Sequence, residues 1–199
     1  VQSGEPLRRS VVDGILNAVD VTTKGVEKGL SKALKVVGDF KRIGGEHFSA
    51  QPEKVSVPIF MHDLISVLRM RTSQTKVQLN YIADAEISIE TRPQLLSQVI
   101  VELVENALIH GFSGQEGKIE VRAGFQGEKL QIRVADSGVG ISAEEMQKVF
   151  DPFYTTRMGT ASGLGLTMVN NLVTGPLKGW VWAEQAPLGG TCFVVELPR

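Results

Sequence analysis

Hydrophobic residues recur with heptad spacing over the first part of the chain, from about residue 7 to residue 43. The two columns of this seam are Val12, Val19, Val26, Ala33 and Phe40, and Leu16, Thr23, Leu30 and Val37. Alternating steps of four and three residues place both columns on one side of a helix, and about 38 residues would make it roughly 57 Å long. We expect this helix either to lie on its own domain or, as its long and narrow seam favours, to enter a bundle or dimer.

The pattern changes after Gly44-Gly45, which ends the helix. We expect residues 1–45 to form a dimerisation helix, residues 46–54 a linker and residues 55–199 a second domain. Alternating apolar residues predict strands at 55–57, 77–81, 87–89, 118–125, 129–135, 179–184 and 191–197. Helical spacing predicts helices at 58–71, 92–110 and 163–173, and a capping box formed by Ser142 and Glu145 predicts a short helix to about Val149.

The mixture of strands and helices without strict alternation indicates an α+β fold. We expect a two-layer sandwich with helices on one face of a mixed, mostly antiparallel sheet. Of the 199 residues, 42% are hydrophobic and 22% charged, which is typical of a folded domain. The chain has 21 Lys and Arg residues and 22 Asp and Glu residues, so it lacks the excess of positive charge that is typical of proteins that bind nucleic acids.

Other classes of protein are excluded by single features of the sequence. One cysteine, Cys192, rules out an internal disulfide framework and a multi-cysteine zinc site. No apolar run reaches the ~18 residues of a membrane span, and no signal peptide opens the chain. The first residue is Val1 rather than Met, so we expect a piece of a longer protein.

Two glycine-rich segments are candidates for binding a ligand. Residues 136–141 (DSGVGI) follow a predicted strand, and residues 159–166 (GTASGLGL) precede a predicted helix. Glycine lets backbone approach a ligand closely, and a helix N-terminus attracts phosphate. Neither segment is a Walker A loop, because no Gly-Lys-Ser/Thr follows, and neither has the parallel βαβ setting of a dinucleotide fingerprint. Taken singly, each segment is also explained by a surface turn.

The predicted helix at 92–110 adds a pair of polar residues. Glu102 and Asn106 are four residues apart and therefore share one helix face. Carboxylate and amide oxygens at this spacing can hold Mg²⁺, which prefers oxygen ligands in octahedral geometry. The alternative is a polar stripe on a solvated face.

Together and in this order, these elements resemble the ATP-binding catalytic domain of sensor histidine kinases, which belongs to the GHKL superfamily with DNA gyrase and MutL. The matching segments are 98–110 (N box), 136–141 (first glycine box), 150–157 (F box), 161–166 (second glycine box) and 189–198 (closing strand). The resemblance covers about residues 53–199 and implies a Bergerat-type fold. Residues 39–43 are similar to the end of the second helix of the family's dimerisation and phosphotransfer hairpin, which implies that the first hairpin helix lies upstream.

The resemblance also implies ATP and Mg²⁺ as cofactors and a role for each matching residue. Asp136 would accept the adenine amino group, Asn106 would bind Mg²⁺, and Arg157 would reach the γ-phosphate from a lid at about 151–162. The full set of residues implied to bind ATP is Asn106, His110, Asp136, Gly138, Gly140, Ile141, Phe153, Arg157, Gly163, Leu164, Gly165, Leu166 and Thr191.

Three positions depart from the family's pattern. Glu102 stands where the kinases usually have Asn; elsewhere in the superfamily a Glu there is the general base, so Glu102 is our candidate catalytic residue, with water-mediated Mg²⁺ binding or no role as alternatives. Ile109 replaces a phosphate-binding Lys, and we expect the neighbouring His110 to restore part of that contact. Ala161 replaces the first Gly of the second glycine box.

The family's reaction moves the γ-phosphoryl group of ATP to a His and then to an Asp of a response regulator. His62-Asp63-Leu64 resembles the phosphoacceptor box, but it lies on a helix of the ATP domain, so we expect the acceptor His upstream of this chain. The partners implied are a second copy through residues 7–43, a response regulator and the upstream sensor region, in the cytoplasm or as the cytoplasmic part of a membrane-bound receptor. The alternatives are a protein-serine kinase of the anti-sigma type and a dimeric nucleotide-binding scaffold without transfer activity.

Overall fold

The computed structural model describes residues 19–20, 22–24, 51–83, 87–112, 114–155 and 162–199. The described residues of the N-terminal region, 19–20 and 22–24, are helical, and the ammonium of Lys24 lies 2.6 Å from the carboxylate of Asp20 one turn earlier. The rest of the predicted dimerisation helix, and most of the predicted linker, lie outside the described residues.

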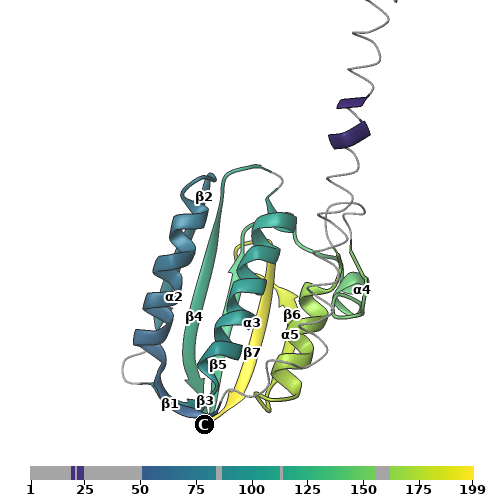
Figure 1. Ribbon diagram of the computed structural model, residues 1–199. Coiled ribbons are helices and arrows are strands. Elements are labelled where there is room, and N and C mark those ends of the chain that lie inside the picture. The colour runs from purple at the N-terminus through teal and green to yellow at the C-terminus, as the bar shows by residue number, and fades with distance from the viewer. Residues whose placement is uncertain (1–18, 21, 25–50, 84–86, 113, 156–161) are drawn as a thin grey trace, which may run out of the picture.

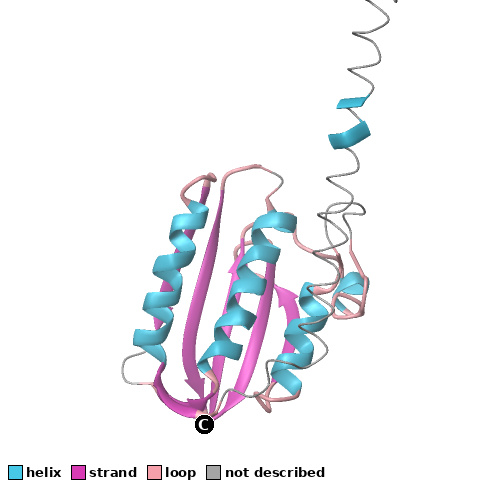
Figure 2. Cartoon of the chain, in the orientation of Figure 1, coloured by secondary structure: helices cyan, strands magenta, loops and turns pink. Residues whose placement is uncertain are grey.

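A five-stranded sheet forms one layer of the domain (Figures 1 and 2). Its strands, in spatial order, are β2 (Val77–Ala83), β4 (Gly117–Gln126), β5 (Lys129–Asp136), β7 (Thr191–Pro198) and β6 (Trp180–Gln185). Strand β2 runs parallel to β4, and the other neighbouring pairs are antiparallel. Two short strands, β1 (Glu53–Ser56) and β3 (Ser88–Thr91), form a separate antiparallel pair. The prediction of a mixed, mostly antiparallel sheet is confirmed.

Helices α2 (Val57–Thr72), α3 (Pro93–Asn106) and α5 (Gly165–Thr174) cover one face of this sheet, with α3 in the middle (Figure 1). The short α4 (Ala143–Met146) lies beyond α5 at the side of the domain. The last turn of the predicted helix at 92–110 is a wider π-helical turn, η1 (Ala107–Gly111). The two-layer α+β architecture predicted from the sequence is therefore confirmed.

The core lies between the helical layer and the inward face of the sheet. Helix α3 contributes one continuous stripe of buried residues: Leu95, Leu96, Val99, Ile100, Leu103 and Val104. On β5, the inward residues Leu130, Ile132 and Val134 are buried, as strand periodicity requires. Burial of one face of each element fixes the register of the strands and the rotation of α3 about its axis. The register and the rotation in turn determine where the polar residues at the ends of β5 and α3 lie.

Most boundaries differ from the prediction by one or two residues, and three of the differences have a clear local cause. Val57 begins α2 instead of ending a strand, because Pro58 favours the first turn of a helix; its N–H still donates to the carbonyl of Ile87 at 2.9 Å. Helix α5 begins at Gly165 rather than Gly163, because Gly163 has a φ of 68°, which a right-handed helix cannot use. The capping box of Ser142 is confirmed, but its helix ends at Met146.

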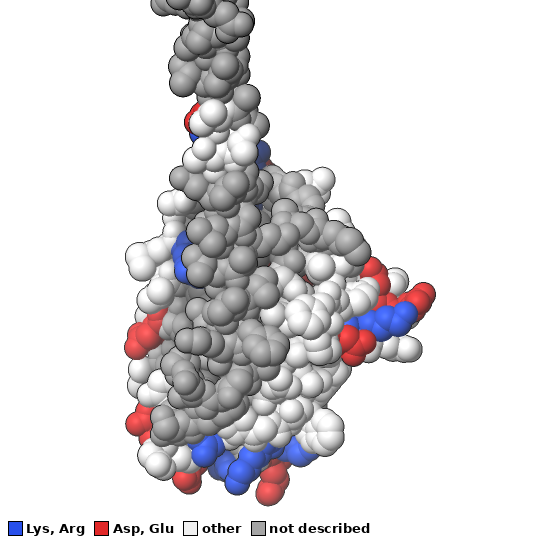
Figure 3. Space-filling view, turned by 45° about the vertical axis from the view of Figure 1, so that its right-hand side comes forward, with Lys and Arg blue, Asp and Glu red and all other residues white. Residues whose placement is uncertain are grey.

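The other face of the sheet carries a small apolar cluster of Ala135, Ala186, Cys192 and Val194, with Trp182 packed against it. On the side of the molecule in Figure 3, Lys and Arg side chains are interspersed with Asp and Glu, which agrees with the near-zero net charge. Among the described residues, no helix combines the length and the apolar character that a membrane crossing requires.

Candidate functional site

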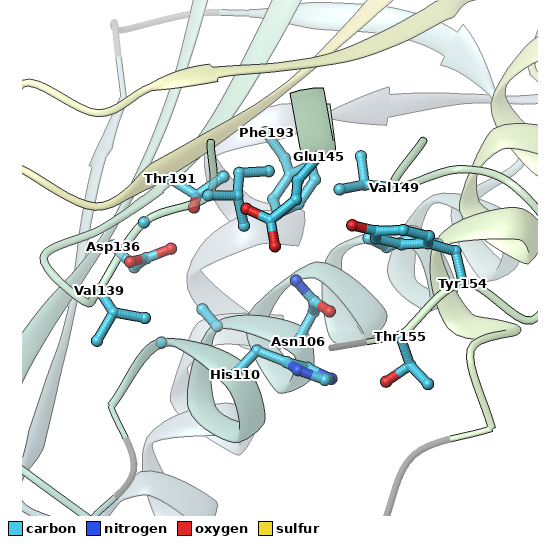
Figure 4. A pocket seen from close by; sticks show the side chains of 15 residues that line it. Asn106, His110, Asp136, Val139, Glu145, Val149, Tyr154, Thr155, Thr191 and Phe193 are labelled. Carbon is cyan, nitrogen blue, oxygen red and sulfur yellow. The ribbon is translucent and has the colours of Figure 1, made fainter. Parts of the chain in front are cut away.

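A cavity with an empty volume of about 810 Å³, counted out to the solvent at its mouth, opens between the end of α3, the end of β5 and the segment before α5 (Figure 4). This size suits a small-molecule ligand. The residues that line it are Asn106, Ala107, His110, Gly111, Asp136, Val139, Gly140, Ile141, Glu145, Val149, Tyr154, Thr155, Leu166, Thr191 and Phe193.

Asp136, the last residue of β5, is the buried carboxylate of this cavity. Its side chain is only 4% exposed, and burial raises the pKa of its carboxyl group. Two backbone N–H groups act in the opposite direction: Gly138 N–H donates to Oδ1 at 2.8 Å, and the backbone of Thr191 also hydrogen-bonds the carboxylate. The carboxylate is thus held in a fixed orientation by backbone donors, with little water to compete for its remaining acceptor positions.

Glycine backbone surrounds Asp136 at van der Waals distance. A Cβ on Gly190 would overlap the Asp136 carboxylate, and a Cβ on Gly138 would lie 2.5–2.7 Å from backbone atoms of Gly111. Val139 N–H also donates to the carbonyl of Gly111 at 3.1 Å, which holds the 136–141 segment against the end of the η1 turn. Glycine at 138 and 190 is therefore required by space alone, and this packing positions the wall of the cavity.

Asn106 and His110 enter the cavity from the end of α3. Asn106 is the last α-helical residue, and His110 lies on the π-helical turn that follows. A π-helical turn widens the helix locally, and such turns are frequent at functional sites. Here the turn places His110 on the same wall of the cavity as Asn106, opposite Glu145 and Tyr154 (Figure 4).

Glu102 lies one turn before Asn106 but does not line the cavity. Its Oε2 atom is 2.9 Å from the position that a Cβ on Gly165 would occupy, so its carboxylate rests against the first residue of α5. Glu102 therefore lies beside the N-terminus of α5, where the partial positive charge of a helix favours a carboxylate.

The far side of the cavity is built by the segment after α4. The ring of Phe150 packs edge-on against Phe193 with centroids 6.1 Å apart, and the hydroxyl of Thr167 on α5 donates to the carbonyl of Phe150 at 3.1 Å. Phe153 has a φ of 65° and is 61% exposed, and its N–H donates to the carbonyl of Gly163 at 3.0 Å. This bond joins the two ends of the segment that was predicted to be the lid.

The structure brings together seven of the residues predicted to bind ATP: Asn106, His110, Asp136, Gly140, Ile141, Leu166 and Thr191. Gly138, Gly163, Leu164 and Gly165 support the walls of the cavity rather than lining it. Phe153 is mostly exposed and does not line the cavity, and Arg157 lies outside the described residues. The lining residues that sequence reasoning missed include Val139, Glu145, Tyr154 and Thr155. Tyr154 and Thr155 lie in the segment that resembles the F box, and this resemblance could have identified them as lining residues.

The described residues support neither a metal site built from protein ligands alone nor a cysteine nucleophile. Nowhere in this part of the chain do three or more His, Cys, Asp or Glu side chains converge to hold a metal ion. Cys192 is fully buried, and burial raises the pKa of its thiol to about 11, so the thiol stays protonated and is a poor nucleophile. A cation in the cavity would have to share its coordination among Asn106, water and the ligand itself.

Comparison with protein families matches residues 91–199 to the family described as "Histidine kinase-, DNA gyrase B-, and HSP90-like ATPase". The chain is 31% identical over 192 residues to the autoinducer 2 sensor kinase/phosphatase LuxQ of Vibrio harveyi, a match that covers 92% of this chain and 22% of that protein. The chain therefore spans about a fifth of the length of this relative.

Solved structures show the same fold. The nucleotide-free catalytic domain of the histidine kinase ThkA matches with a TM-score of 0.67 and 24% identity over 75% of this chain and 96% of that domain. ThkA in complex with the response regulator protein TrrA matches with a TM-score of 0.69 and 20% identity, over 100% of this chain and 53% of the ThkA chain. The chain belongs to the family of histidine kinase-, gyrase B- and HSP90-like ATPases and carries the catalytic ATP-binding domain of a sensor histidine kinase.

Proposed function

We propose that this chain is the catalytic part of a two-component sensor histidine kinase, which binds Mg-ATP and transfers its γ-phosphoryl group to a histidine. Asp136 carries this proposal: it is a buried carboxylate, surrounded by glycine backbone, at one end of a cavity that holds Asn106 and His110 at its other wall. A ligand that fits must offer a hydrogen-bond donor to Asp136 and an anionic part to Asn106 and His110. ATP has both.

Asp136 would select the base. The adenine amino group donates to the carboxylate, whereas guanine would present a carbonyl oxygen there and leave the buried carboxylate unpaired, at a cost of about 1–3 kcal/mol or more. Thr191, 5% exposed at the start of β7, would add its hydroxyl beside the base, directly or through water. Gly140, with a φ of 70°, forms the turn that lets the purine lie against backbone.

The phosphates would lie toward Asn106, His110 and the start of α5. Magnesium, when bound to the amide oxygen of Asn106, would offset the charge of the triphosphate. The backbone at 163–166 would offer N–H groups to phosphate at the N-terminus of a ten-residue helix, and Arg157 would reach the γ-phosphate. His110 would replace part of the contact that Lys makes in kinases with a basic residue at position 109.

The transfer step is a substitution at phosphorus. A neutral imidazole nitrogen attacks the γ-phosphorus, the N–P bond forms, and the bond to the bridging oxygen breaks with ADP leaving. Glu102, beside Gly165, is our candidate for accepting the proton that the imidazole loses. We assign the acceptor His to a helix upstream of residue 1. His62 is 73% exposed on α2, which lies on the opposite side of α3 from α5 (Figure 1), and a domain cannot readily present that surface to its own site.

We further propose a response-regulator Asp as the next acceptor, and a cytoplasmic location for this part of the protein. The structure of ThkA with a response regulator supports the first of these, since that kinase shares the fold of this chain. The upstream sensor region would belong to the same polypeptide, because the sensor kinase that this chain resembles is much longer.

A transfer assay tests the function. The purified chain, labelled ATP, Mg²⁺ and the separately made upstream hairpin helix should yield label on the helix. Asn106→Ala should lower the rate of transfer about tenfold, because one oxygen ligand of the cation is lost. Label on a Ser-bearing partner instead would indicate a protein-serine kinase, and ATP binding without any transfer would indicate a nucleotide-binding scaffold.

A separate measurement tests self-association through residues 7–43. An unpaired bundle helix exposes an apolar seam, and such a surface tends to associate. We expect the chain to sediment as a dimer, and Leu16→Asp with Leu30→Asp, which places two charges on the seam, to make it a monomer. A monomeric wild-type chain at micromolar concentration would contradict this proposal and leave the proposed ATP site unaffected.

A further inference from the structure

Glu145 has two structural roles, one in capping a helix and one in lining the cavity, and only the first is evident from the sequence. It is the third residue of the short α4, where its Oε2 accepts the N–H of Ser142 at 2.7 Å and its own N–H donates to the Ser142 hydroxyl at 3.2 Å. Its side chain also lines the nucleotide cavity, with the carboxylate pointing into the space between Asp136 and Tyr154 (Figure 4). The capping bond engages Oε2 and fixes the carboxylate, and Oε1 can still accept a hydrogen bond from a ligand.

The position of Glu145 corresponds to the middle of a bound nucleotide. If the base lies at Asp136 and the phosphates lie at Asn106 and His110, the sugar must bridge the two ends. Glu145 lies over this middle part in Figure 4. It also lines a second, more polar hollow that Gly189 and Gly190 border, so it stands at the wall between the two spaces.

The chemistry of the group suits a sugar hydroxyl. Hydrogen bonds from Ser142 lower the pKa of the Glu145 carboxyl group, so the group is ionised at neutral pH and acts only as an acceptor. A ribose offers two neighbouring hydroxyl donors, and hydrogen bonds to an ionised acceptor are about twice as strong as those between neutral groups. A deoxyribose lacks one of these donors.

We propose that Glu145 is a specificity residue that accepts a hydrogen bond from the ribose hydroxyls and makes the cavity prefer ribonucleotides to deoxyribonucleotides. This inference rests on the proposed function, because it requires the cavity to bind ATP in the orientation given above.

Calorimetric titration of the full chain with ATP, 2′-deoxy-ATP and 3′-deoxy-ATP, each with Mg²⁺, tests the inference. The wild-type chain should bind ATP at least about tenfold more tightly than the weaker of the two deoxynucleotides, as expected for one hydrogen bond to a charged group. Glu145→Ala should reduce this ratio to about two or less, and Glu145→Gln, which keeps a neutral acceptor, should give an intermediate ratio. The control is Ser142→Ala, which removes the other half of the capping box but leaves the carboxylate, and should keep the wild-type ratio.

Three outcomes would overturn the inference. The first is an unchanged ratio in Glu145→Ala. The second is an equal loss of affinity for all three nucleotides with a higher requirement for Mg²⁺, which would place the carboxylate on the cation instead of the sugar. The third is a wild-type chain that binds ATP without any preference for ribose. A folded chain that binds none of the nucleotides would instead remove the proposed function itself, together with the inference.

Discussion

Asp136→Asn is expected to weaken ATP binding about 100-fold while leaving the fold intact. The two side chains have nearly the same shape, so Gly138 N–H can still donate to the remaining oxygen at position 136. The amide nitrogen, however, would turn a donor toward the adenine amino group, which is also a donor. Two donors facing each other in a buried site lose one hydrogen bond and desolvate both groups.

The same substitution should not lower the free energy of unfolding. Burial raises the pKa of Asp136, so the folded chain holds the charged form less readily than the unfolded chain does. This unfavourable contribution to stability is absent below the usual pKa of an aspartic acid and develops as the pH rises through the raised pKa. At neutral pH the neutral Asn lacks this contribution, so its melting temperature should equal or exceed that of the wild type.

Calorimetry with Mg-ATP and thermal unfolding of both proteins at neutral pH measure the two effects. The matched control is Glu144→Gln, an exposed carboxylate on α4 that does not line the cavity, and it should retain both affinity and melting temperature. ATP binding by Asp136→Asn within threefold of the wild type would contradict the assignment of Asp136 to the base, whatever the stability of the variant.

The sequence was sufficient for the parts of the fold that depend on local periodicity. The alternation along 129–135 and the stripe from Leu95 to Val104 placed β5 and α3, because burial of one face follows directly from the spacing of apolar residues. The two glycine segments and Asn106 could be placed at one site only through the resemblance to a known family, since nothing in their spacing alone brings them together.

The parts that could not be predicted depend on contacts between distant segments. The π-helical turn at Ala107–Gly111 ends where Gly111 meets the backbone of Gly138, and periodicity along one helix carries no information on that contact. Glu145 has a sequence signal as a capping residue, but its place in the cavity follows from how α4 packs against the rest of the domain. Phe153 was expected to bind ATP through the resemblance, yet it is 61% exposed and does not line the cavity.

Gly190→Ala is expected to abolish measurable ATP binding, although position 190 is not itself expected to touch a phosphate or the cation. A methyl group there would overlap the Asp136 carboxylate and lie 2.6 Å from the backbone nitrogen of Gly138, the donor that orients this carboxylate. Both neighbours are held by backbone, so they cannot move aside as the end of a flexible side chain would. Such overpacking costs about 1–3 kcal/mol of stability, and here it also displaces the group that reads the base.

Gly111→Ala provides the matched comparison, because it also adds a methyl group next to the Asp136 carboxylate. Its Cβ would lie 3.4 Å from Asp136 Oδ1, an ordinary contact, so we expect affinity for ATP within about threefold of the wild type and a small change in melting temperature. Calorimetry on the folded fraction of each variant measures the difference. Equal affinities for the two variants would mean that the orientation of Asp136 does not control binding. A large loss confined to Gly190→Ala supports this control, because only the Gly190 methyl group overlaps the carboxylate and the backbone around it.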